Sequence, residues 1–189
     1  MDKDKPDNAA LGKTLKDVQP AIAALPGNVD DTLKNEKANM KDAANRGKDG
    51  IDERLKELDE LAKKNDALRK KLGPAGPYEP GFVEEADDNR EELRDIASKA
   101  LKDVNPDLNV NVFGTEKGDE LRRDLGDRAF GPKVEVTPNN AKEETNQLGD
   151  DVKNLRDKLQ AYKDGLDDTV KKNSDIADQI AKAIPPALQ

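Results

Sequence analysis

Two short stretches of the 189-residue sequence have residue types and spacings that occur in ligand sites. Asp107-x-Asn109-x-Asn111 has the opening spacing of an EF-hand loop, in which carboxylate and amide oxygens coordinate calcium. Its sixth position is Val112 instead of the glycine that the sharp turn needs, and its twelfth is Gly118 instead of glutamate. The pattern therefore does not predict an EF-hand, and solvated polar side chains are the simpler interpretation.

The second stretch, Leu11-Gly12-Lys13-Thr14, has the spacing found at the end of a phosphate-binding loop. The partner glycine of such a loop would fall at position 7, which is Asp7. A carboxylate there would repel the phosphate that the backbone amides of the loop should hold. We therefore expect no nucleotide cofactor, and the sequence predicts no catalytic, cofactor-binding or metal-binding residue.

The sequence contains no cysteine and no histidine. Disulfides, Cys/His zinc sites and histidine-based catalysis are therefore excluded. Neighbouring carboxylates carry no diagnostic value, because 41 residues are Asp or Glu. Raising the pKa of a carboxyl for acid–base catalysis also requires apolar burial, which a chain with 33% hydrophobic residues cannot readily supply. We expect a protein that is not an enzyme.

The charges of the chain limit its class of partner. The 33 Lys and Arg residues are scattered among the acids, and the net charge is −8. Nucleic acids and anionic membrane surfaces both attract clustered basic residues, and no apolar run approaches the ~20 residues of a membrane span. We therefore expect a protein partner, either a second copy or the helix of another protein, and neither nucleic acid nor membrane.

Residues 1–7 contain no apolar core of the kind that a signal peptide requires. The absence of cysteine fits a reducing compartment. Both features favour a cytoplasmic location, although an extracellular protein without disulfides would have the same composition.

Proline and glycine divide the chain, because proline cannot donate a backbone hydrogen bond and disfavours helix in the residue before it. The breaks fall at Pro26-Gly27, in residues 73–81, at Asn105-Pro106 and at Pro138. The predicted segments are an N-terminal helical segment (1–27), a helical hairpin (28–104), a non-helical insert (105–138) and a C-terminal heptad helix (139–189).

The C-terminal segment has the clearest periodicity. Steps of alternately three and four residues from Thr145 reach mostly apolar residues, and such a 3.5-residue repeat predicts a seam between supercoiled helices. Asn173 on this seam either fixes the register of pairing or is a tolerated polar residue on a partly hydrated seam. The residues expected to mediate assembly are Leu148, Val152, Leu155, Leu159, Leu166, Asn173, Ile176 and Ile180.

Helical periodicity also extends over residues 29–72 and 82–104. Gly47 and Gly50 each cost about 1 kcal/mol relative to alanine inside a helix, so we expect a kink or a break there. The insert alternates apolar and polar residues at 108–112 and at 134–136. This alternation predicts a β-ribbon or an extended stretch packed along the helices, and the second is favoured because an isolated ribbon is marginally stable.

Residues 11–36 align without gaps on residues 148–173, and both contain Asp-Asp-Thr and begin with Leu-Gly. Residues 50–56 align on 165–171 with a different offset, which leaves the period of any repeat open. The chain is either one unit of a tandem array with the start of the next, or a set of unrelated heptad helices.

These patterns predict an all-α fold, an elongated antiparallel helical bundle or coiled-coil-like helices with a short extended or β-ribbon insert. The favoured function is that of a structural or scaffold protein, a segment of an elongated helical rod of cytoskeletal type that acts through helix–helix contacts. Two alternatives stay open, a hydrophilic stress-protective protein that is disordered alone, and a surface-exposed helical module that binds a host protein. The sequence assigns no family.

Overall fold

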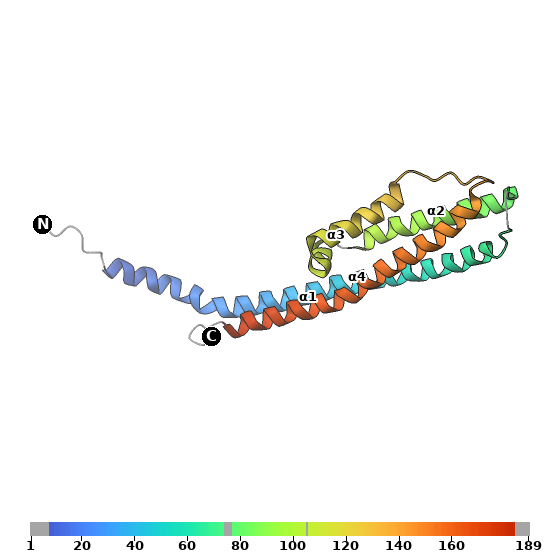
Figure 1. The fold of residues 1–189 in the computed structure, drawn as a ribbon. Coiled ribbons are helices and arrows are strands. Elements are labelled where there is room, and N and C mark those ends of the chain that lie inside the picture. The colour runs from blue at the N-terminus through green and yellow to red at the C-terminus, as the bar shows by residue number, and fades with distance from the viewer. Residues whose placement is uncertain (1–7, 74–76, 105, 184–189) are drawn as a thin grey trace. The chain divides into compact units, whose positions relative to one another are not determined.

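The computed structural model describes the backbone of residues 8–73, 77–104 and 106–183, and the side chains of residues 31–73, 77–104, 118–172, 174–180 and 182. The regular structure in these ranges consists of the helices α1 (Asn8–Arg69), α2 (Pro80–Asp103), α3 (Pro106–Phe130) and α4 (Ala141–Ala183), with no strand (Figure 1). This confirms the predicted all-α class. The chain divides into unit 1 (Met1–Lys41 with Val170–Gln189) and unit 2 (Asp42–Thr169). None of the described helices combines the length and apolarity of a membrane span.

Proline begins two of the helices. Pro80 and Pro106 are the first residues of α2 and α3, where the missing N–H has no cost because amides of the first turn have no partner within the helix. α2 ends at Asp103, and the N–H of Val104 donates to the carbonyl of Ala100 (2.9 Å). The predicted boundary at Asn105-Pro106 therefore separates two helices.

Residues 106–130 form α3, so the prediction of a non-helical insert over 105–138, with its β-ribbon, is wrong for this range. The alternation at 108–112 covers too few residues to decide the local structure. Leu121, Leu125 and Ala129 instead recur every four residues, and all three are buried. Burial of this stripe favours helix. The side chains of 108–112 lie outside the described residues.

The connection between α3 and α4 lies along α2. Arg94 donates to the carbonyl of Gly131 (2.9 Å), and Val136 packs against Phe82. Figure 1 shows this connection as a drawn-out trace, and residues 132–137 have no regular secondary structure. The alternation at 134–136 therefore does not mark a strand in the described residues.

Ion pairs between helices give the directions of the helices in unit 2. Residues that come later in α1 pair with residues that come earlier in α4, and the same holds for α1 and α2, so α1 runs opposite to both helices. The pairs are Lys48–Asp167, Asp52–Lys163 and Asp59–Arg156 between α1 and α4, and Arg54–Asp103, Glu57–Lys99 and Lys64–Glu92 between α1 and α2.

α1 continues as helix through Gly47 and Gly50, so the predicted break there is absent. A Cβ atom at Gly47 would lie 3.5 Å from Cδ1 of Leu166 in α4, and one at Gly50 would lie 2.7 Å from Cγ of Asp103 in α2. The glycines thus allow close approach of two other helices, and the contacts offset their low helix propensity. α1 also includes Pro26, where a helix boundary was expected.

Candidate functional site

The seam predicted on α4 is buried wherever it lies in unit 2. Eight side chains with the predicted spacing are at most 5% exposed, namely Thr145, Leu148, Val152, Leu155, Leu159, Tyr162, Leu166 and Thr169. On the facing side, Asn65 of α1 donates its amide to the carbonyl of Thr145 (2.9 Å). This part of the seam therefore packs against helices of its own chain.

The predicted assembly residues Asn173, Ile176 and Ile180 lie in unit 1, and the two isoleucines are exposed, unlike the seam residues of unit 2. Ile176 is 53% exposed and Ile180 is 47% exposed, while Ala177 between them is buried. The side chain of Asn173 lies outside the described residues. A straight α-helix drifts ~20° per heptad from a strict 3.5-residue repeat, so the buried side of α4 moves from the position of Ile176 to that of Ala177. The two isoleucines, one turn apart, then share an exposed face.

Within unit 1, an ion pair between Lys37 and Asp178 joins α1 to α4. The hydrogen bond from Lys37 holds the pKa of the Asp178 carboxyl below its usual value. Solvent screens this exposed pair, so it contributes little to stability. Leu33 and Met40 of α1 are only half-buried. The described part of unit 1 thus leaves apolar surface incompletely covered.

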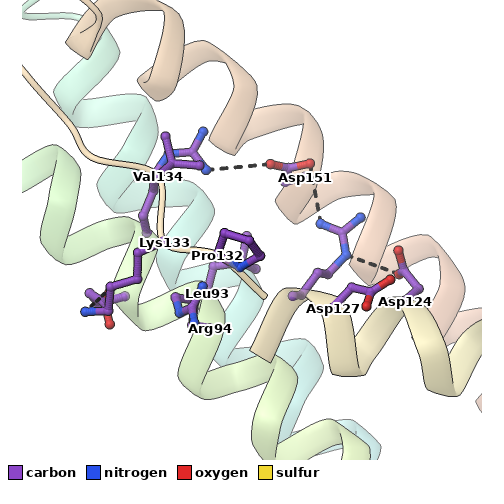
Figure 2. Close-up of a pocket in the computed structure, with 11 residues that line it drawn as sticks. Leu93, Arg94, Asp124, Asp127, Pro132, Lys133, Val134 and Asp151 are labelled. Carbon is purple, nitrogen blue, oxygen red and sulfur yellow. Dashed lines mark hydrogen bonds and ion pairs between the residues drawn. The ribbon is translucent and has the colours of Figure 1, made fainter. Parts of the chain in front are cut away.

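A charged pocket of ≈300 Å³ in unit 2 is lined by α2, α3, α4 and the connection (Figure 2). Asp151 lies between two arginines, with Arg128 at 3.4 Å and Arg90 at 4.0 Å. Arg128 also pairs with Asp124 (3.1 Å), and Arg90 pairs with Glu144. The lining of the pocket carries four basic and four acidic side chains, so it offers no net charge to a ligand. The ion pairs join α2, α3 and α4 and so hold these helices together.

A second charged cluster, centred on the buried Arg54, lies between α1 and α2. Arg54 is 8% exposed and donates to Glu53 (2.8 Å) and Glu57 (2.9 Å), and its Nε–H is directed at the carbonyl of Gly50 (3.4 Å). Oδ2 of Asp103 lies 3.2 Å from Nε but accepts no hydrogen bond from the described residues. Burial raises the pKa of the Asp103 carboxyl, and the nearby Arg54 charge opposes this shift only in part.

A groove of ≈510 Å³ lies between α2 and the extended connection, and Val134, 47% exposed, contributes to its wall. Sequence reasoning missed this groove because its walls come from residues that are far apart in the chain. It also assigned no role to the charged residues of the two clusters. The signal available there was residue type, because arginine is preferred over lysine in buried ion pairs, and Arg54, Arg90 and Arg128 hold both clusters.

Among the described side chains, no group of three acidic residues is placed to hold a metal ion. The side chains of the two stretches with ligand-like spacing, 11–14 and 107–111, lie outside the described residues. No protein-family model, curated protein or solved structure shows a significant match to this chain.

Proposed function

We propose that this protein is a non-enzymatic structural or scaffold protein that associates with a second copy of itself through helix–helix contacts. The contrast along α4 carries this proposal. Leu148 to Leu166 are buried inside unit 2, whereas Ile176 and Ile180 of the same helix are exposed in unit 1. Two isoleucines one turn apart give a second helix an apolar face to cover.

The charges beside this face suit a second copy. The exposed residues around the isoleucines include Lys171, Lys172, Asp175 and Asp178. The signs are mixed, so two copies do not repel each other and are able to form pairs of opposite charge. In this proposal the chain is a segment of an elongated antiparallel helical bundle in a cytoplasmic rod of cytoskeletal type. The alignment of residues 11–36 on 148–173 favours tandem units of such a rod.

Sedimentation equilibrium of the full chain tests the association. We expect self-association that depends on concentration and that is lost in the double variant Ile176→Ser/Ile180→Ser, because serine removes the apolar face. Lys153→Ser/Asp157→Ser, which changes two exposed polar residues one turn apart on the same helix and away from the isoleucines, is the matched control and should associate as the wild type does.

Circular dichroism of each variant must show unchanged helicity, so that any loss of association reports on the surface. A chain that stays monomeric at every concentration, or an isoleucine variant that associates normally, would contradict the proposal. Small-angle scattering would show whether the particle is elongated. A far-UV spectrum without helical features would favour the disordered stress-protective alternative.

A further inference from the structure

The groove between α2 and the connection has one helical wall and one extended wall. The helical wall consists of residues spaced three or four apart, which lie on one side of α2: Pro80, Val83, Glu84 and Asp87. The extended wall consists of residues 133–136 and Pro138. The volume of the groove, ≈510 Å³, is in the range of ligand-binding pockets. The shape suits a short stretch of extended chain.

The interior of the groove is partly apolar. Val134 is 47% exposed and Val83 is half-buried, and both contribute to the lining. Beside them Val136 is buried against Phe82 and Ala86, which holds the connection on α2. An apolar side chain that enters the groove would remove Val83 and Val134 from water.

The backbone of the connection has one edge with unused hydrogen-bonding groups. The opposite edge is occupied by the side chain of Asn140. The N–H of Thr137 donates to Oδ1 of Asn140 (2.7 Å), and Nδ2 of Asn140 donates to the carbonyl of Glu135 (2.9 Å). Backbone groups of successive residues in an extended chain point to opposite sides. Those of Val134 and Val136 therefore point away from Asn140, and they have no hydrogen-bond partner among the described residues.

A hydrogen bond joins the end of the connection, in the turn at residues 138–140, to the segment before α2. The N–H of Tyr78 donates to the carbonyl of Pro138 (3.1 Å), and Pro138 lies two residues beyond Val136. The chain then enters α2 at Pro80, so this pairing stops after one hydrogen bond. The groove begins there, and the backbone groups of Val136 and Val134 are the ones that an added strand could use.

The rim of the groove carries uncompensated negative charge. Glu84, Asp87 and Glu135 are exposed, and none of the three has an ion-pair partner in the described part of the chain. The one basic residue of the lining, Lys133, pairs with Glu91 (2.8 Å). A segment that complements this rim carries Lys or Arg.

We propose that this groove binds a short extended segment of a partner protein in which basic and apolar residues alternate. The segment adds as a strand to the edge of Val134 and Val136, its apolar side chains enter between Val83 and Val134, and its basic side chains pair with the acidic rim. This inference concerns unit 2 alone and does not depend on the association proposed through Ile176 and Ile180.

Titration of the full-length, ¹⁵N-labelled chain with the capped peptide Lys-Val-Lys-Val-Lys tests the proposal. We expect the largest amide shifts at Val134 and Val136 and weaker binding as salt rises. The capped peptide Glu-Val-Glu-Val-Glu should not bind. A version of the basic peptide with N-methylated valines should lose most of its affinity, because it cannot donate to the strand edge.

Two pairs of variants locate the site. Glu84→Lys/Asp87→Lys should weaken binding about tenfold, because two exposed attractions become repulsions. Asp119→Lys/Glu120→Lys on α3, also exposed, changes the net charge equally and should leave the affinity unchanged. Val134→Pro removes a free N–H without breaking an existing hydrogen bond and should abolish binding, whereas Val134→Thr keeps the N–H and should bind.

The proposal is overturned if the basic peptide does not bind, if its amide shifts lie away from the groove, or if the acidic peptide binds equally well. Equal affinities of the two lysine double variants, or of the Val134→Pro and Val134→Thr variants, also overturn it. If the amide shifts of Val134 and Val136 grow with protein concentration in the absence of peptide, the occupant of the groove is a second copy of the chain. This result would also overturn the proposal that a basic segment of a partner protein binds there.

Discussion

Leu155→Ala in α4 is expected to destabilise unit 2 strongly, whereas Ile176→Ala in the same helix is not. Leu155 is 0% exposed, and Ile176 is 53% exposed. Truncation of a fully buried leucine removes packing contacts and leaves a cavity, which costs about 2–5 kcal/mol. A substitution at an exposed position usually changes the free energy of unfolding by less than about 0.5 kcal/mol. The two variants thus separate the buried part of the seam from its exposed part.

A loss of about 3 kcal/mol corresponds to a fall in Tm of about 10 °C, at roughly 3 °C per kcal/mol for a domain of this size. Since domains are stable by about 5–15 kcal/mol, the alanine variant should still fold. Leu155→Asp adds the cost of an unpaired buried polar group, several kcal/mol more, and should therefore lose helicity at 25 °C.

Circular dichroism at 222 nm, recorded during heating and during urea titration, measures both effects. Each scan is repeated at two protein concentrations in the Ile176→Ser/Ile180→Ser background, which removes the proposed self-association, because a seam that packs within one chain then gives a Tm that does not depend on concentration. A cost below about 1 kcal/mol for Leu155→Ala would refute the assignment of this residue to a packed core. A Tm of the variant that rises with concentration would show that the seam pairs between chains.

Two glycines and one carboxyl give further tests. Gly126→Ala should raise the free energy of unfolding by about 0.5–1 kcal/mol, because its new Cβ would meet no described atom within 4 Å beyond its chain neighbours and the adjacent backbone of its own helix. Gly50→Ala should lower the free energy of unfolding, because its Cβ would lie 2.7 Å from Cγ of Asp103. Equal urea midpoints of the two variants would contradict this. Burial raises the pKa of the Asp103 carboxyl above its ordinary value of 3.8. Between the unfolded and folded pKa values the folded chain therefore binds more protons than the unfolded chain, and this contribution to stability is lost as pH rises through that window. Asp103→Asn should remove this dependence, and an unchanged difference in urea midpoint between mildly acidic and neutral pH would refute it.

The sequence by itself determined the helical class and the register of the buried α4 seam. Both depend on local information, because an apolar residue every three or four positions can be buried only as a helix. Leu148 to Leu166 keep that spacing and are buried. The same reasoning located the ends of α2, which begins at Pro80 and ends just before the break at Asn105-Pro106, although it failed at Pro26 inside α1.

Only the tertiary structure decided which elements meet. Residues 106–130 are helical although part of their pattern alternates, and α1 passes through Gly47 and Gly50 because other helices approach them closely. The pairing of Arg54 with Asp103 and the groove beside Val134 likewise join residues from different elements. Their positions depend on packing between distant segments, whose free energy exceeds local propensities and which the spacing of residues along one helix does not specify.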